Sequence, residues 1–566
     1  MITNKNIEIK LSDNTTLMMD IYRPDSKKKV PSLICFSPYG KDVQALALER
    51  KSLRLGQVLF DQTIEVPRID YFVENGYAVI VPSPRGVSTS EGYFTGMLSM
   101  QDQRDCVEII EWTAKQDFST ENIGMIGTGY AGKIQPLVAS HKPKYLKAIM
   151  PVEVTYDFYA DCYWGGGITD HNFYYAGLVP AINPITEAEL NNSEDDLKEM
   201  LKKCRELPQV KANSYFYRGL DMYPPRHYTW NIDILLQPKG SSFWSDRSME
   251  NKEIDIPMYI VSPYYEHGKT TISAINLYNS KGIKSTKKLM LSHHALNRKS
   301  PDDFTLTETL KWYDYHLKGI ETGIEDEKAV KVFVMGKEKF RFEDTFPLKR
   351  SENVNLYLGK NSSLKENVSL TETSFDVLPH RPPTKVSQNF EDIPALTYTT
   401  SSLEKDTEVT GVITISIYAS VDINKGNLIA KLWDLNPDGV RTHLSSGYLS
   451  TCYRGTKNSG FEYGIANDFD TELEVIENEI YKYEFELSPT SNVFKKGNKI
   501  QVEIKTMDKR AIVDNEKTSF AMIHPSSRVD GIQPITEFCC YKVYYGNEYR
   551  SCINLPIVYG REGTDI

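Results

Sequence analysis

The stretch IGMIGTGYAGKIQ, residues 123–135, has the pattern of a short buried strand that turns sharply into a helix. Glycines at Gly127, Gly129 and Gly132 suit such a turn, because a residue without a Cβ tolerates strained dihedrals and close packing. In the strand–turn–helix motif G-x-S-x-G the middle residue is a serine nucleophile, and here that position is Gly129. Taken alone, the stretch fits a rebuilt catalytic turn and a plain strand–helix turn equally well.

The segments around this turn alternate between strand and helix patterns. Apolar runs predict strands at 30–40, 77–86, 121–127 and 146–154, and helical spacing predicts helices at 102–116 and 131–142. Continuous apolar runs are typical of strands buried on both faces of a parallel sheet. The order strand, helix, strand, helix therefore indicates an α/β sheet with right-handed crossovers.

The rest of the chain adds an insertion and a second domain. We predict an α/β sheet domain over 1–155 and 251–340, interrupted by a mostly helical insertion at 156–250. Such an insertion is typical of a lid over an active cleft, and a decorative helical subdomain is the alternative. Residues 345–566 alternate at period two between turn signals such as NPDG at 436–439, which predicts a C-terminal β-sandwich.

Composition narrows the class of protein. The 566 residues carry a net charge of −10, which argues against nucleic acid or an anionic membrane as partner. We find no apolar run near the ~20 residues of a membrane helix and no signal-peptide core, so we expect a cytoplasmic protein. Eight cysteines without a C-x-x-C pair suggest neither zinc nor a disulfide framework. We find no phosphate loop, dinucleotide fingerprint or metal-ligand cluster, so we expect no cofactor and no metal.

Seven short motifs follow one another along the chain: LSDNTTLMMDIYRPD (11–25), FSPYGK (36–41), SPRGVSTSEGYF (83–94), GTGYAGKIQ (127–135), FWSDRS (243–248), LKWYDYHLKGIETGI (310–324) and LIAKLWDLNPDGV (428–440). In this order they resemble the cocaine esterase / X-prolyl dipeptidyl-peptidase group of α/β-hydrolases, peptidase family S15 with the CocE/NonD hydrolases. The resemblance implies an α/β-hydrolase sheet domain with an inserted helical cap and a C-terminal jelly-roll-like β-sandwich. A homodimer is also compatible with it.

The same resemblance implies roles for residues near the turn. The backbone N–H of Tyr130 would point at a developing oxyanion, assisted by the positive end of the helix that begins there, and Tyr39 would be a second donor. Gly129 would stand at the nucleophile position without a side chain. Arg85 and Glu91 are expected to fix the loop beneath the turn through a charge-assisted bond.

The acid and base of a catalytic triad are altered as well. In YIVSPYYEHG (259–268), Glu266 stands where the resemblance places an aspartate, and a glutamate can also orient an imidazole. In KLMLSHHALNRK (288–299), an ungapped match places Leu296 at the histidine position, whereas a loop shorter by two residues places His294 there. His294 is therefore the first candidate for the base, and His293 is the second. The alternative is that these side chains face solvent.

Aromatic residues of the insertion are candidates for substrate binding. Their alternative role is packing inside the lid. The residues are Tyr156, Tyr159, Tyr163 and Trp164.

Three readings of the function follow. In the first, an α/β-hydrolase-fold enzyme acts on an ester, an amide or another carbonyl-containing small molecule through an oxyanion hole and a His/Glu general base. Its reaction would be nucleophile-free hydrolysis or non-hydrolytic proton transfer in a biosynthetic pathway. In the second, the chain is a pseudoenzyme that binds a ligand or partner without turnover. In the third, it is an ordinary esterase of the family with an engineered Ser-to-Gly change at 129.

Overall fold

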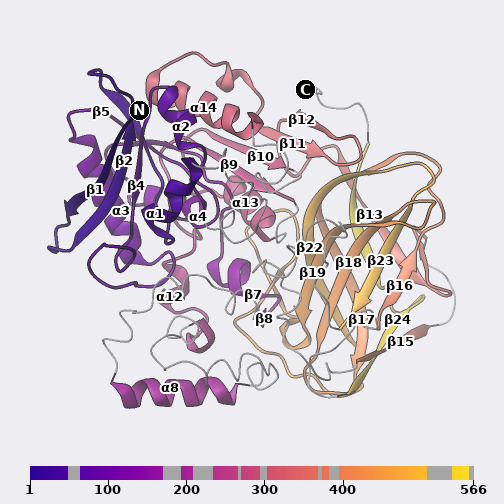
Figure 1. Cartoon of the computed structure of the whole chain (residues 1–566). Coiled ribbons are helices and arrows are strands. Elements are labelled where there is room, and N and C mark those ends of the chain that lie inside the picture. The colour runs from indigo at the N-terminus through magenta and orange to yellow at the C-terminus, as the bar shows by residue number, and fades with distance from the viewer. Residues whose placement is uncertain are drawn as a thin grey trace.

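The computed structural model describes residues 1–48, 64–169, 193–207, 234–264, 269–292, 303–367, 373–380, 394–506 and 538–559. Figure 1 shows an α/β part, which contains the N-terminus, beside a β-sandwich built from the later strands. The predicted fold class, an α/β-hydrolase sheet domain with an inserted cap and a C-terminal β-sandwich, is confirmed by this arrangement.

The first sheet has ten strands in the order β1-β2-β4-β3-β5-β6-β9-β10-β11-β12. Their bounds are β1 Ile2–Lys10, β2 Thr16–Arg23, β3 Val30–Ile34, β4 Ala78–Pro82, β5 Ser119–Met125, β6 Leu146–Ile149, β9 Met258–Pro263, β10 Lys287–Ser292, β11 Val330–Val334 and β12 Lys339–Glu343. The strands from β4 to β11 pair in parallel, whereas β1, β2 and β12 pair antiparallel at the two edges. Parallel strands such as β4 and β9 are buried along their whole length, because both of their faces are covered.

Helices cover both faces of this sheet. On one face lie α3 Met100–Ala114, α4 Tyr130–Ala139 and α13 Lys269–Asn279, and on the other lie α2 Ile69–Glu74 and α14 Asp303–Lys318. Side chains of one strand alternate between these faces: Ala78 and Ile80 of β4 join the first core cluster, and Val79 and Val81 join the second.

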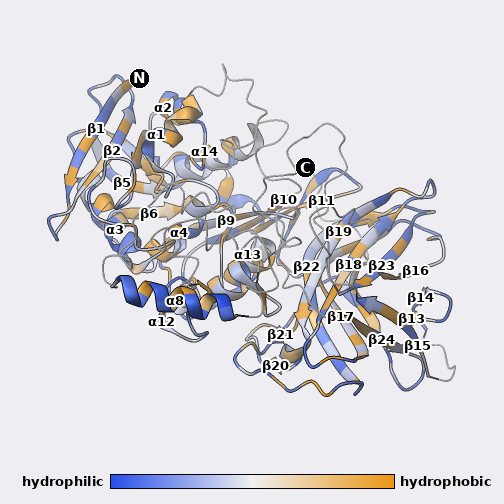
Figure 2. Ribbon diagram, turned by 60° about the horizontal axis from the view of Figure 1, so that its bottom comes forward, coloured by the Kyte–Doolittle hydropathy of each residue, from blue (hydrophilic) through white to orange (hydrophobic). Residues whose placement is uncertain are grey.

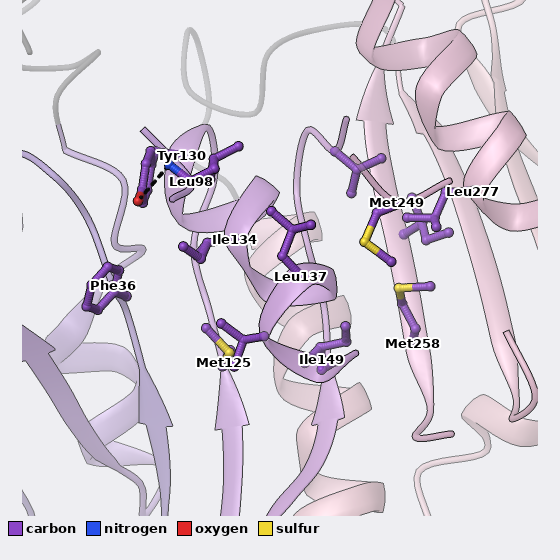
Figure 3. Packing of buried hydrophobic residues seen from close by; sticks show 14 of the residues in the cluster. Phe36, Leu98, Met125, Tyr130, Ile134, Leu137, Ile149, Met249, Met258 and Leu277 are labelled. Atoms are coloured by element: carbon purple, nitrogen blue, oxygen red, sulfur yellow. Dashed lines mark hydrogen bonds between the residues drawn. The ribbon is translucent and has the colours of Figure 1, made fainter. Parts of the chain in front are cut away.

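Helix α4 sits in the middle of the first core cluster. Figure 3 shows Ile134 and Leu137 of α4 above Met125 of β5 and Ile149 of β6. All four side chains are fully buried. This packing fixes the start of α4, and with it the preceding turn, against the carboxyl ends of the central strands.

The insertion lies between β6 and β9. Its described elements are a π-helical turn Tyr159–Tyr163, the short strands β7 Trp164–Gly165 and β8 Ile168–Thr169, α8 Glu194–Glu206 and α12 Ser242–Ser245. Helix α8 agrees with the mostly helical insertion predicted over 156–250 and follows its capping residue, Ser193, whose hydroxyl accepts from the N–H of Asp196. Figure 2 shows that most residues of α8 are hydrophilic, and its buried residues are Leu197, Leu201 and Cys204. The β7–β8 hairpin is absent from the sequence-based prediction.

The second sheet system forms the sandwich. Its strands are β13 Ser351–Gly359, β14 Ser363–Lys365, β15 Ser374–His380, β16 Leu396–Thr399, β17 Thr407–Val421, β18 Asn427–Leu435, β19 Arg441–Ser450, β22 Tyr481–Phe494, β23 Lys499–Lys505, β24 Cys539–Tyr545 and β25 Cys552–Val558. At the predicted NPDG turn, Gly439 has φ 84° and donates its N–H to the carbonyl of Asn436 at 3.0 Å. A small hairpin joins β20 Thr456–Lys457 to β21 Ala466–Asn467.

The two parts are in contact. Met335, which follows β11, donates its N–H to the carbonyl of Ser491 in β22 at 3.0 Å and accepts from the N–H of Val493 at 2.9 Å. Asn279 of α13 also donates to the hydroxyl of Tyr463 at 3.2 Å. Within the described ranges, no helix combines the length and the hydrophobicity needed to cross a membrane.

Candidate active site at a strand–helix turn

The turn quoted from the sequence joins β5 to α4. Gly129 occupies the N-cap position of α4 with φ 63° and ψ −122°, a backbone conformation that glycine adopts without the penalty paid by other residues. Gly132 faces the chain beyond β6, where a Cβ would lie 1.9 Å from the carbonyl oxygen of Val152. The local sequence therefore permits both the sharp turn and the close approach of α4 to the sheet.

A carboxyl group from another segment sits in this turn. Tyr130 donates its backbone N–H to Oε1 of Glu65 at 2.6 Å, and Ala131 donates to Oε2 at 3.1 Å. The backbone of Thr128 also donates to the carbonyl of Glu65 at 3.0 Å. The first N–H groups of a helix lack partners within the helix and favour negative charge, so they form a natural carboxylate site.

Glu65 also fills the space beside Gly129. A Cβ on residue 129 would lie 2.6 Å from Oε1 of Glu65, well inside van der Waals contact. The Glu65 residue is only 4% exposed. The carboxyl group therefore lies where a side chain at position 129 would project.

A buried polar network holds Glu65 in place. The N–H groups of Glu65 and Val66 donate to Oε1 of Gln44 at 2.7 Å and 3.0 Å. Gln44, in the short helix α1 Gly40–Gln44, donates through Nε2 to the hydroxyl oxygen of Ser37 at 3.2 Å. The Ser37 hydroxyl in turn hydrogen-bonds to the Glu65 carboxyl. The side chain of Glu65 thus links the turn before α4 to the loop after β3 and to α1.

The surroundings of Glu65 change its acidity. Burial raises the pKa of Glu65 to about 8, and the hydrogen bonds from Ser37, Tyr130 and Ala131 and the charge of Lys133 oppose this rise only in part. Burial and the charge of Glu65 also raise the pKa of the Tyr39 phenol above its ordinary value of 10.0. Glu65 therefore exchanges its proton close to neutral pH, where Tyr39 keeps its own.

The side chain of Tyr130 points away from Glu65 into the core. Its hydroxyl donates to Oδ2 of Asp102 in α3 at 2.6 Å and accepts from the N–H of Leu98 at 3.2 Å, the dashed line in Figure 3. Burial raises the pKa of Asp102 to about 7, although the Tyr130 hydroxyl opposes the rise. Tyr130 thus contributes its backbone N–H to the turn and its ring to the junction of α3 and α4.

Three of the aromatic residues predicted to bind substrate, Tyr159, Tyr163 and Trp164, lie in one cluster of the insertion. Tyr159 stacks on Trp164 with ring centroids 5.6 Å apart, and both Tyr159 and Tyr163 contact Trp244 edge-on or tilted. Tyr156 contacts Phe461 of the sandwich part at 5.8 Å. The alternative role, packing within the lid, describes these contacts; substrate binding by the four residues stays a prediction.

Of the other residues predicted to act in catalysis, the structure describes Tyr39 but not the acid and the base. Tyr39 caps α1 and is half-buried. Glu266, His293 and His294 lie outside the described residues, so their roles stay predictions. The strands that precede them, β9 and β10, end side by side, since Pro263 pairs with Ser292.

The predicted charge-assisted bond between Arg85 and Glu91 is wrong. Arg85 binds Asp105 of α3 through two hydrogen bonds, of 2.5 Å and 2.8 Å, instead of Glu91. Glu91 accepts from the N–H of Thr16 at 2.8 Å. The geometric reason is that Asp105 is fully buried directly opposite the guanidinium, where two parallel hydrogen bonds can form.

Sequence reasoning missed Glu65. The one signal in its neighbourhood is its position between Ile64 and Val66, two apolar residues that are buried in the structure. No known motif links this segment to the turn at Gly129. Among the residues that the structure describes, no group of three or more His, Cys, Asp or Glu side chains could hold a metal ion.

Comparisons with known proteins cover almost the whole chain. Residues 13–295 match the model of the X-Pro dipeptidyl-peptidase (S15) family, and residues 322–532 match the X-Pro dipeptidyl-peptidase C-terminal non-catalytic domain. A cocaine esterase from Rhodococcus sp. is 24% identical over 604 residues, which cover 98% of each chain. A putative Xaa-Pro dipeptidyl-peptidase from Bacillus anthracis is 23% identical over 86% of this chain and 79% of its own.

A solved structure shows the same fold. The crystal structure of a CocE/NonD family hydrolase from Staphylococcus aureus superposes with a TM-score of 0.77 at 22% sequence identity, covering 99% of this chain and 94% of the other. An α-amino acid ester hydrolase superposes with a TM-score of 0.70 at 17% identity, covering 98% and 96%. Both similarities extend through the α/β part, the insertion and the sandwich.

Proposed function

Because the chain belongs to the X-Pro dipeptidyl-peptidase (S15) family of hydrolases, we propose that it acts on an ester, amide or other carbonyl-containing small molecule at the turn of Gly129, without a serine nucleophile. The observation that carries this proposal is the pair of N–H groups on Tyr130 and Ala131, which converge on one carboxyl group. A turn that holds a carboxyl in this way stabilises negative charge at the place where the reacting groups of an acyl-transfer enzyme lie, and Tyr39 is the donor left for the substrate oxygen.

The reaction that fits these residues is direct attack by water. A base takes a proton from water, the water oxygen bonds to the carbonyl carbon, and the oxyanion is stabilised by nearby donors such as Tyr39. The tetrahedral intermediate then expels the alcohol or amine, which takes the proton back from the base. Among the sequence-predicted residues the base would be His294 or His293, oriented by Glu266. Proton transfer to and from a substrate without hydrolysis would use the same groups.

One observation favours the second candidate, a pseudoenzyme. Glu65 already occupies the N–H groups of Tyr130 and Ala131 and the space beside Gly129. With Glu65 held there, a substrate oxygen finds no backbone donor at the turn, and without Tyr39 as a donor the family fold would serve binding alone. The same crowding weighs against the third reading, because a serine at 129 would require Glu65 to move.

Release of p-nitrophenol from short acyl esters tests the proposal. We expect turnover by the unmodified protein and a loss of about 10²-fold in Tyr39→Phe, the size of effect reported for one oxyanion donor. Tyr145→Phe is the matched control, because Tyr145 lies by Lys144 at the surface end of α4 and β6. An unmodified protein that is inert toward the whole ester series would contradict the hydrolytic proposal and favour the pseudoenzyme.

The predicted homodimer and cytoplasmic location enter here only as proposals. Size-exclusion chromatography with light scattering of the purified chain measures the first.

A further inference from the structure

Building on the proposed function, we propose that Glu65 is its general base and supplies, from a separate segment, the reactive side chain that position 129 lacks. The inference goes beyond the family resemblance, because no motif of the sequence singles out Glu65. It also replaces His294 as the first candidate for the base.

The Glu65 carboxyl lies where the reactive side chain of such a turn would lie. Oε1 of Glu65 lies 2.6 Å from the point where a Cβ of residue 129 would stand. In a strand–helix turn of this kind, the side chain at this position faces the reacting carbon. A carboxyl oxygen so placed is within one water molecule of a substrate carbonyl bound at the same turn.

The hydrogen bonds that the Glu65 carboxylate accepts hold it in place. A carboxylate has about four acceptor positions. Tyr130, Ala131 and Ser37 donate to three of them. Counting only donors among the described residues, one position is left to take or to carry a proton. Glu65 is thus held rigidly by three donors and retains a single point for proton exchange.

The start of α4 stabilises negative charge on Glu65. The N–H groups of Tyr130 and Ala131 and the N-terminal end of α4 stabilise the ionised form of Glu65. In a serine hydrolase, donors at this place stabilise the charge that develops on the substrate. Here they stabilise the base, and Tyr39 remains for the substrate oxygen.

The proton balance of the reaction is closed by Glu65 alone. Ionised Glu65 takes one proton from water while the water oxygen forms a bond to the carbonyl carbon, whose C=O electron pair moves to oxygen. When the intermediate collapses, the C=O bond re-forms, the bond to the leaving oxygen breaks, and that oxygen takes the proton from Glu65. Ester and water become acid and alcohol, and Glu65 returns to its ionised form.

The pH dependence follows from the groups that face Glu65. Among the described residues these are Cys35 after β3, Tyr39 at the start of α1, the Tyr130 phenol, and Lys133 of α4, whose Nζ lies 3.9 Å from Glu153. Burial raises the pKa of Cys35 and of Tyr39 above their ordinary values, so both stay neutral while Glu65 titrates. Because only the ionised form is a base, activity rises with pH through the pKa of Glu65, about 8.

Glu65→Gln tests the inference. We expect kcat/KM for p-nitrophenyl acetate to fall by ~10²-fold or more and the rise with pH to disappear, with KM little changed. Glu65→Asp keeps a carboxyl and retains the rise with pH at a lower rate. Glu108→Gln, a carboxylate on α3 that bonds Ser12 at 2.8 Å, is the matched control. Circular dichroism confirms that each variant is folded.

Two outcomes separate this inference from the proposed function. If Glu65→Gln keeps the rate and the pH profile while His294→Asn loses both, the inference is overturned and the hydrolase stands. If the unmodified protein is inert, the side-chain ¹³C signal of Glu65, assigned by its loss in Glu65→Gln, is titrated with and without 4-nitroacetophenone. A carbonyl bound beside Glu65 shifts that titration; an unchanged titration overturns the inference.

Discussion

At the scale of residues, the site depends on the pair formed by Gly129 and Glu65. The turn motif with its glycines could be predicted from sequence, because strand, turn and helix are neighbours in the chain. Glu65 could not, because its carboxyl reaches the turn only through the tertiary fold, and a lone glutamate carries no motif. The triad positions Glu266, His293 and His294 stay predictions from the resemblance.

The pair makes a prediction about stability. Gly129→Ser should lower the free energy of unfolding by roughly 1–3 kcal/mol, because of its positive φ and the 2.6 Å approach of its Cβ to Glu65 Oε1. In a Glu65→Ala background the steric part of this cost disappears. Urea unfolding of the four proteins of this double-mutant cycle measures the difference. Equal costs of Gly129→Ser in both backgrounds would show that the two residues do not compete for space.

At the scale of elements, sequence patterns predicted most of the strands and helices that place the turn. Strands β3 and β4 follow from continuous apolar runs, and α3 follows from its helical spacing. The hairpin of β7 and β8 could not be predicted, since strands of two residues leave no periodicity. The short helix α2 could not be predicted either, because its six residues are too few to show a helical pattern.

The junction of α3 and α4 gives a second prediction. Tyr130→Phe removes the hydroxyl that donates to Asp102 at 2.6 Å and leaves a buried carboxyl without that donor. We expect a loss of about 1–3 kcal/mol in the free energy of unfolding. The backbone N–H of residue 130 is unchanged, so turnover per folded molecule should be retained. Unchanged stability, or lost turnover in a stable variant, would contradict the separation of ring and N–H.

At the scale of the whole molecule, the α/β part and the sandwich are joined by a buried ionic network. Arg341 of β12 is 1% exposed and donates to both carboxylate oxygens of Glu408 in β17, at 2.6 Å and 3.0 Å, and to Glu343 at 2.7 Å. The α/β part and the sandwich could be predicted from the sequence. The ionic contact between them could not, because Arg341, Glu343 and Glu408 belong to no motif.

Arg341→Ala should therefore destabilise the whole chain. It leaves the part-buried carboxylate of Glu408 without its two hydrogen bonds from Arg341 and leaves Glu343 with Arg350 as its remaining arginine partner, at a cost of about 3–5 kcal/mol. Arg441→Ala is the control, since Arg441 is more exposed, pairs with Glu503 at 3.3 Å and lies over the Trp433 ring. Thermal unfolding measures both variants, and an effect of Arg341→Ala no larger than that of the control would contradict the structural role of the network.

The central claim, that Glu65 replaces the missing nucleophile side chain as a base, is tested most directly by one curve. That curve is kcat/KM of the unmodified protein for p-nitrophenyl acetate against pH. The account predicts a rise of about tenfold per pH unit below the pKa of Glu65, and a plateau above about pH 8. A rate that is level through this range, or that reaches its plateau near the ordinary pKa of a histidine, would contradict it.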